Sequence, residues 1–179
     1  KVWRYGHDLR GLQTSAEDPD RGASTMTYDE VGRLSVVRSK GSTLAYSYDT
    51  LSRKTGMYLN EVGGTTLAEW TYDTVPGGKG QVASSTRYVD GSAYTSKVLS
   101  YDPLYKPTAQ SLTIPAREGL LAATYTTAAG YNPDGSLDTS FGDGGKAVFN
   151  LSSILLMWTS WGRDGPGRGR GGGRERGRD

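Results

Sequence analysis

The sequence predicts an all-β protein, built as an array of antiparallel β-hairpin repeats that form one open, twisted sheet. Three observations support this prediction. Short segments alternate between polar residues and aromatic or aliphatic ones, which is typical of strands. A Tyr-Asp pair recurs at nearly regular spacing. Glycine accounts for 26 of the 179 residues and gathers in turn dipeptides, so we expect many short strands.

The clearest hairpin signal lies in residues 25–34, which read TMTYDEVGRL. Met26 and Tyr28 alternate with threonines, as in a strand with two unlike faces. The carboxylate of Asp29 can accept hydrogen bonds from backbone N–H groups two residues on, which starts a turn. Gly32 can adopt the positive φ that closes such a turn. The segment therefore predicts a strand, a turn and a second strand.

Most other segments are diverged copies of this one. The aspartates of the copies are residues 8, 29, 49, 73 and 102, so the steps between them are 21, 20, 24 and 29 residues. A step near twenty that lengthens where a loop is inserted indicates a repeat architecture. Ser52 stands in the glycine's place in one copy, and His7 stands in a tyrosine's place in another. The residues predicted to carry the repeat are Tyr28, Asp29, Gly32, Arg33, Tyr46, Tyr48, Asp49, Arg53, Trp70, Tyr72, Asp73, Tyr101 and Asp102.

The remaining elements follow from the same alternation and from turn residues. Asp90-Gly91 suits a tight primed hairpin turn between two longer strands. Residues 116–123 are the only plausible helical turn, and Gly119 weakens it. An apolar fraction of 35% favours a sheet covered by amphipathic aromatics over a thick two-layer core. The further expected strands are residues 44–48, 57–59, 67–72, 83–89, 93–101, 111–114 and 122–127.

The pattern Tyr-x-Tyr-Asp-x-x-Gly-Arg-Leu, repeated about every twenty residues, resembles the YD repeat of rearrangement-hotspot (Rhs) proteins. The same repeat occurs in wall-associated bacterial proteins, insecticidal toxin-complex shells and teneurins. The resemblance covers Tyr5 to about Tyr131, and four or five copies in register make it specific. Residues 97–107 and 113–115 resemble the long repeats of actinobacterial members.

The resemblance implies a structural function. Full-length relatives wind such hairpins into a shell that encloses a toxic C-terminal domain or displays one at the cell surface, so we expect this chain to be a section of that shell. The expected partners are further YD repeats of a parent chain and an enclosed toxin domain. The expected location is secreted or cell-surface, although the chain shows no signal peptide and starts at Lys1, as a fragment would. No enzymatic activity, cofactor or metal is expected.

After Tyr131 the sequence changes in character. Residues 132–145 resemble one unit of a bacterial β-rich repeat whose copies read NPDGSLDxSFGxGG, although Asn-Pro-Asp-Gly also occurs at YD-repeat turns. From Gly162 onward the chain is low-complexity Gly and Arg, with too little apolar surface to fold. We therefore divide the chain into a YD-repeat array (1–131), a β-rich segment of uncertain assignment (132–161) and a disordered tail (162–179).

Composition excludes several classes of site. Without cysteine there are no disulfides or thiol ligands. His7 is the sole histidine, so the sequence has almost none of the residues that zinc sites and Ser-His-acid catalysis require. The net charge is +2, of which residues 162–179 contribute +3, so residues 1–161 carry −1 and show no basic stripe for nucleic acid. The longest apolar run, residues 154–158, is too short to span a bilayer.

Three binding functions can be set against the structural one. The tail resembles RGG segments, which bind RNA by charge and cation–π stacking, but acidic residues interrupt its arginines and no aromatic accompanies them, so nucleic acid is not the expected partner. Aligned turn aspartates could bind calcium, but we expect each carboxylate to be occupied by N–H groups of its own turn. Strand aromatics could stack on cell-wall or cell-surface glycans, but cross-strand pairing within the sheet is the favoured explanation for them. Those aromatics are Tyr46, Tyr48, Tyr58, Trp70, Tyr72, Tyr88, Tyr94 and Tyr101.

The repeat array also predicts how the isolated chain behaves. About five hairpins are too few to close a shell, so the sheet must end in unpaired edges. Neither end carries a capping unit. We expect marginal stability, fraying at residues 1–24, disorder beyond about Trp161, and association through the edges as concentration rises.

Overall fold

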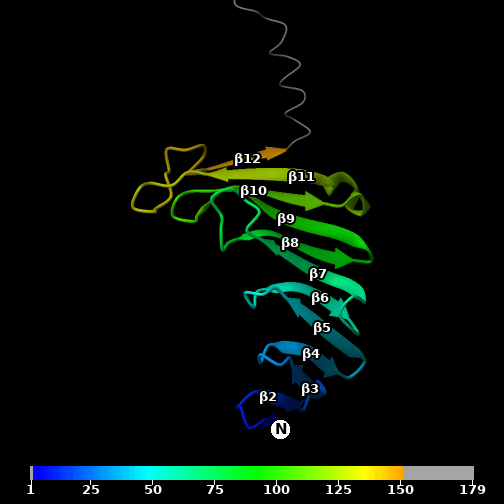
Figure 1. Cartoon of the computed structure of the whole chain (residues 1–179). Helices are drawn as coiled ribbons and strands as arrows, with labels where there is room; N and C mark the ends of the chain where they lie inside the picture. Colours follow the sequence, from blue (N-terminus) through cyan, green and yellow to red (C-terminus); the bar gives the residue numbers. More distant parts are fainter. Residues whose placement is uncertain (1, 151–179) are drawn as a thin grey trace, which may run out of the picture.

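The computed structural model describes residues 2–150, and they form one antiparallel sheet of 12 strands (Figure 1). Each strand pairs with its neighbours in sequence, and β1 and β12 lie at opposite edges, so the expected open all-β sheet is confirmed. The strands are β1 (Arg4–His7), β2 (Gln13–Asp18), β3 (Gly22–Tyr28), β4 (Leu34–Ser39), β5 (Ser42–Tyr48), β6 (Lys54–Leu59), β7 (Thr65–Tyr72), β8 (Val82–Val89), β9 (Ser92–Tyr101), β10 (Pro107–Ile114), β11 (Ala123–Ala129) and β12 (Lys146–Asn150).

The sheet is one layer thick, so most of its side chains are half-buried or exposed. No large side chain is fully buried in the part of the chain that the structure describes. Backbone pairing and cross-strand side-chain contacts must therefore stabilise the sheet in place of a two-layer core. Apart from the three glycines Gly56, Gly78 and Gly145, the buried residues among residues 2–150 are Ala45, Ala68, Val75, Ala83 and Ser111.

Because neighbouring strands run in opposite directions, their connections gather at two ends. The β1–β2, β3–β4, β5–β6, β7–β8, β9–β10 and β11–β12 connections carry the repeated Asp or its counterpart, and we call this side the Tyr-Asp turn end. The remaining connections form the opposite turn end. In Figure 1 the Tyr-Asp turn end lies to the left and the opposite turn end to the right.

The opposite turn end matches the local turn signals. Asp90 and Gly91 both have positive φ, 48° and 76°, as a primed hairpin turn requires. A short 3₁₀ helix, η1 (Ala116–Leu121), stands where the helical turn was expected, and Gly119 interrupts it with a φ of 57°.

At the Tyr-Asp turn end, β6 and β10 begin earlier than the alternation indicated, because their first residues pair with Tyr48 and Tyr101.

The segment after Tyr131 continues the same sheet. Residues 130–145 form the β11–β12 connection, and β12 pairs antiparallel with β11 along its length. The tail at residues 162–179, and the disorder expected there, lie outside the described residues. Within residues 2–150 no helix is long and apolar enough to cross a membrane.

Candidate functional site: the ladder of Tyr-Asp turns

The turn at Asp29 shows the geometry of the repeat. The Asp29 N–H donates to the carbonyl of Arg33 at 2.8 Å, and the Gly32 N–H donates back to the carbonyl of Asp29 at 3.0 Å. Oδ1 of Asp29 accepts the N–H groups of Val31 and Arg33, at 3.2 and 2.8 Å. Gly32 has a φ of 85°, so its predicted positive φ is confirmed. The Asp carboxylate thus fixes the inside of the turn.

The same turn recurs along the whole sheet. Turns starting at Asp8, Asp49, Asp102 and Asn132 repeat both backbone hydrogen bonds within 0.2 Å of those at Asp29. Asn132 was assigned to a different segment, yet its turn has this geometry with an amide in place of the carboxylate. The residue just before the one that ends the turn has positive φ in every described copy, whatever its identity: Gly11 (79°), Gly32 (85°), Ser52 (63°), Gly80 (86°), Tyr105 (60°) and Gly135 (82°).

The turn at Asp73 departs from this pattern because its loop is longer. Its backbone N–H still bonds the residue that ends the turn, the carbonyl of Gln81, at 3.1 Å. Its Oδ1, however, accepts the N–H of Gly80, seven residues on, at 2.6 Å. The Asx-turn bonds expected of every repeated aspartate are therefore present at Asp8, Asp29, Asp49 and Asp102 but replaced at Asp73.

Tyrosine hydroxyls tie each hairpin to the one before it. The Tyr48 hydroxyl donates to the carbonyl of Leu34, just beyond the preceding Tyr-Asp turn, at 2.8 Å. We call this series the tyrosine ladder. Sequence reasoning missed it, although the use of 12 Tyr against 2 Phe was a signal that the hydroxyl is needed. Its other rungs are Tyr28 to Gln13 (2.8 Å), Tyr72 to Lys54 (2.8 Å), Tyr101 to Val82 (2.7 Å) and Tyr131 to Pro107 (3.3 Å).

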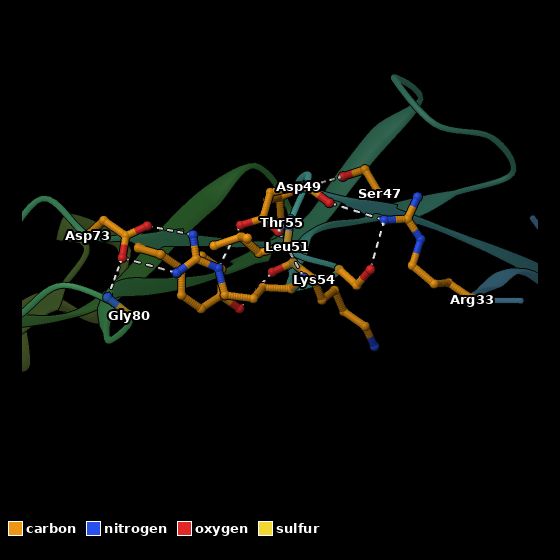
Figure 2. Close-up of polar contacts among 11 residues, drawn as sticks. Arg33, Ser47, Asp49, Leu51, Lys54, Thr55, Asp73 and Gly80 are labelled. Carbon is orange, nitrogen blue, oxygen red and sulfur yellow. Dashed lines mark hydrogen bonds and ion pairs between the residues drawn. The ribbon is translucent and has the colours of Figure 1, made fainter. Parts of the chain in front are cut away.

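Cations at the end of a turn reach the next turn. Arg33 donates from Nε to Asp29 of its own turn at 2.6 Å. It also donates from Nη1 to the carbonyl of Asp49 at 3.1 Å (Figure 2). Its guanidinium carbon lies 4.9 Å from the centre of the Tyr48 ring. Two N–H groups of one guanidinium thus connect consecutive repeats, and the ring below adds a cation–π contact.

Arg53 repeats this arrangement one hairpin further along. Its Nε donates to Asp49 at 2.7 Å, and its two Nη atoms donate to the carboxylate of Asp73 at 3.1 and 2.5 Å. Figure 2 shows Asp73 between this guanidinium and the N–H of Gly80. The Arg53 guanidinium lies 4.3 Å from the Tyr72 ring centre, and Lys106 takes the same place over Tyr131 at 5.1 Å.

Contacts at the turns lower the pKa of the Asp29, Asp49 and Asp73 carboxylates, and burial raises the pKa of the Tyr48 phenol. The hydrogen bonds from Arg53 and then from Gly80 lower the pKa of Asp73 to about 2. For Asp29 and Asp49, burial raises the pKa, but the hydrogen bonds and charge of the paired arginine outweigh it and leave the pKa below its usual value. Burial raises the pKa of Tyr48, so its hydroxyl remains a donor at neutral pH.

A second feature that sequence reasoning missed is a row of hydroxyl pairs beside the turns. The Oγ atoms of Ser47 and Thr55 lie 2.9 Å apart on neighbouring strands. In every pair of this row, one partner immediately precedes a ladder tyrosine in the sequence. The recurrence of Ser or Thr at that position was the sequence signal for the row. The other pairs are Thr27–Ser35 (3.3 Å), Thr71–Ser84 (2.7 Å) and Ser100–Thr108 (2.6 Å).

The remaining strand aromatics are also engaged within the sheet. Tyr46 and Trp70 line an open hollow of about 730 Å³, but the ammonium of Lys54 lies 4.2 and 5.9 Å from their ring centres. The hydroxyls of Tyr88 and Tyr94 donate to Glu69 and Glu118. Among residues 2–150 no three His, Asp or Glu side chains gather as a metal site would need, and His7 is exposed.

Solved structures share this fold. A scan against family models finds no match, and neither does a search of the curated proteins. The Photorhabdus luminescens Tc holotoxin pore with the TccC3 mutation D651A matches 75% of this chain at 17% identity, with a TM-score of 0.56. The crystal structure of TcdB2-TccC3 matches 75% at 16% identity, with a TM-score of 0.58.

The present chain spans only 7–8% of the length of those Tc chains, and at such identities the likeness shows the fold alone. Those chains contain Rhs/YD-repeat shells. The predicted likeness to a YD-repeat sheet is therefore confirmed at the level of the fold. The assignment to the actinobacterial type stays a prediction.

Proposed function

We propose that this chain is a structural section of the wall of an Rhs-type shell, with no catalytic role. The tyrosine ladder carries the proposal. Its hydroxyls, and the cations at three turns, bind the neighbouring repeat, so the recurring polar groups serve to align hairpins in sequence order. A wall needs units with this property, because each repeat must recognise its neighbours along the chain.

The finer parts of the proposal concern the parent protein. The Tc chains of similar fold are many times longer than the present chain, and this supports a parent with further YD repeats on either side of it. In that parent the wall encloses or displays a C-terminal toxin domain outside the producing cell. The residues of the ladder would then act by holding the wall closed.

Limited proteolysis of the parent protein tests enclosure. We expect its C-terminal domain to resist trypsin while the wall is intact. Replacing Tyr28, Tyr48 and Tyr72 with Phe removes three ladder rungs and should make the domain accessible, because consecutive hairpins can then separate. If trypsin digests the C-terminal domain as fast in the unmodified parent as in the triple variant, enclosure is overturned.

A matched control removes the same number of hydroxyls elsewhere in the sheet. The triple variant in which Tyr58, Tyr88 and Tyr94 become Phe keeps all five ladder rungs, so protection should persist. Equal loss of protection in both triple variants would show that the ladder has no special role. The glycan alternative predicts retention on peptidoglycan, where the proposed function predicts none.

A further inference from the structure

The two faces of the sheet carry different side chains, and the register of the strands assigns each side chain to a face. Paired residues on neighbouring strands point to the same face, whereas successive residues of one strand point to opposite faces. One face, which we call the aromatic face, carries two rows of paired residues: Tyr46, Met57, Ala68, Arg87 and Tyr94, and then Trp70, Ser85, Ser96, Leu112 and Tyr125.

The opposite face, which we call the hydroxyl face, is mainly polar. Hydroxyls on this face pair with one another across strands, at 3.0 Å for Thr86–Thr95 and at 2.9 Å for Thr113–Thr124. Side chains of the hydroxyl face are therefore satisfied by their own neighbours and by water. These threonines belong to one row of paired residues, which runs Glu69, Thr86, Thr95, Thr113 and Thr124.

The open hollow of about 730 Å³ that Tyr46 and Trp70 line lies on the aromatic face. Its floor is low because the side chains of Ala68, Ser85 and Ser96 are small, whereas those around them are large. Neither serine hydroxyl has a hydrogen-bond partner within residues 2–150. The larger apolar and aromatic side chains that line the hollow are Met57, Leu67, Tyr94 and Leu112.

A surface of this composition is suited to contact with another polypeptide. Contiguous exposed apolar groups mark contact surfaces, and burying them contributes about 25 cal/mol per Å². Met57 and Leu112 offer apolar contacts, and the serine hydroxyls on the floor can bond peptide N–H and C=O groups. A sugar fits less well, because it stacks on a free ring face, and the Lys54 ammonium already lies 4.2 and 5.9 Å from the ring centres of Tyr46 and Trp70.

A shell wall has one face towards the solvent and one face towards what the shell encloses. We propose that the aromatic face of this section is the inner face, and that the C-terminal domain of the parent lies against it with apolar side chains in the hollow. The hydroxyl face then meets the solvent, where its paired hydroxyls expose little apolar surface. This inference rests on the proposed wall function and adds the direction in which the section faces.

Photo-crosslinking in the full-length parent protein tests this direction. Single variants replace one tyrosine with p-benzoylphenylalanine, at Tyr46 or Tyr94 on the aromatic face and at Tyr58 or Tyr88 on the hydroxyl face. After irradiation, the protein is denatured and digested, and mass spectrometry identifies the crosslinked peptides. We expect crosslinks to the C-terminal domain from Tyr46 and Tyr94, in yields at least ten-fold above those from Tyr58 and Tyr88.

The outcomes separate this inference from enclosure itself. Equal yields from the two faces, or crosslinks to the C-terminal domain from the hydroxyl face alone, would overturn the inference and leave enclosure standing. Crosslinks from Tyr46 that join two copies of the parent, with none to the C-terminal domain, would also overturn it. A C-terminal domain that trypsin digests freely in the unmodified parent overturns the proposed function, and this inference with it.

Two adjacent residues of β9 supply a matched test of the hollow. Ser96 and Lys97 are both exposed, and they point to the aromatic face and the hydroxyl face respectively. Ser96→Trp fills the hollow, so it should lower the crosslinking yield from Tyr46 at least three-fold. Lys97→Trp adds the same ring to the other face and should leave that yield unchanged. If both variants melt as the parent does, an unchanged yield with Ser96→Trp would contradict the role of the hollow.

Discussion

The two ends of the strands connect the hairpins in different ways. At the Tyr-Asp turn end the same tyrosine-to-carbonyl bond recurs between successive hairpins, and cations at three turns reach the next turn. At the opposite turn end the contacts do not repeat. Arg117, for example, bonds the carbonyl of Val89 and the carboxylate of Asp90. The Tyr-Asp turn end therefore closes each hairpin and aligns it with the next, whereas the opposite turn end joins consecutive hairpins without a repeated side-chain contact.

The turns vary in length at both ends, but at the Tyr-Asp turn end the repeated contacts persist when the turn is longer. Turns at the opposite end range from the two residues Lys40-Gly41 to residues 115–122, which include a 3₁₀ helix. At the Tyr-Asp turn end even the long turn after Asp73 keeps the outer N–H-to-carbonyl bond and its rung of the ladder. Repeated contacts constrain a turn, because any change in that turn must remain compatible with the repeat on each side of it.

The largest expected effect comes from moving Tyr-Asp turns to the wrong end. Deleting residues 29–48 removes one whole repeat and leaves the later turns in place, so the chain should still melt cooperatively. Deleting residues 30–39 removes β4 together with the turn residues 30–33 and sends every later Tyr-Asp turn to the opposite end, so the cooperative transition should disappear. Thermal melts followed by circular dichroism measure this, and equal melts of the two variants would contradict alignment by the ladder.

Backbone strain should be similar at both ends. Gly32→Val and Gly41→Val each place a β-branched residue at positive φ, 85° and 78°, and each should cost about 1–3 kcal/mol in the free energy of unfolding. Gly32→Asn should cost less, because Asn tolerates this region better. Urea denaturation gives the values. An unchanged midpoint for Gly32→Val would mean that the turn does not constrain the hairpin.

Loss of a ladder hydroxyl should lower the free energy of unfolding by less than the glycine substitutions do. The loss should, however, differ between the two turn ends. Tyr48→Phe leaves the ring under Arg33 and deletes the bond to Leu34, so we expect a loss of about 0.5–1.5 kcal/mol. Tyr94→Phe removes an exposed hydrogen bond at the opposite end and should cost less. Tyr5→Phe, for which the structure records no hydroxyl bond, serves as control. Equal losses for Tyr48→Phe and Tyr94→Phe would erase the distinction.

The smallest expected effect is on acid stability. The pKa of Asp73 is about 2 in the folded chain against 3.8 ordinarily, so its contribution is complete above pH 4 and is lost as the pH falls towards 2. The lowered pKa values of Asp29 and Asp49 act in the same direction. Melting temperatures measured from pH 5 to 2 should therefore fall, and Arg53→Gln should flatten the curve. A wild-type melting temperature that is constant over this range would rule out the predicted role of these pairs.

Local sequence determined the elements of this protein. Period-two alternation placed the strands, and Asp29, Gly32 and Asp90-Gly91 placed turns whose φ values the structure bears out. Such predictions succeed because a turn or a strand depends on residues only a few positions apart, through backbone sterics and short hydrogen bonds. The shortage of apolar residues likewise indicated a sheet without a thick core.

Only the tertiary structure decided what those elements contact. The rung from Tyr48 to Leu34 joins residues 14 apart, and the bond from Arg53 to Asp73 joins residues 20 apart. Neither pairing can be read from local preference, because both depend on the register of adjacent hairpins and on where each side chain projects from the pleat. For the same reason the hollow on the aromatic face became visible only when strands β5 to β10 were brought side by side.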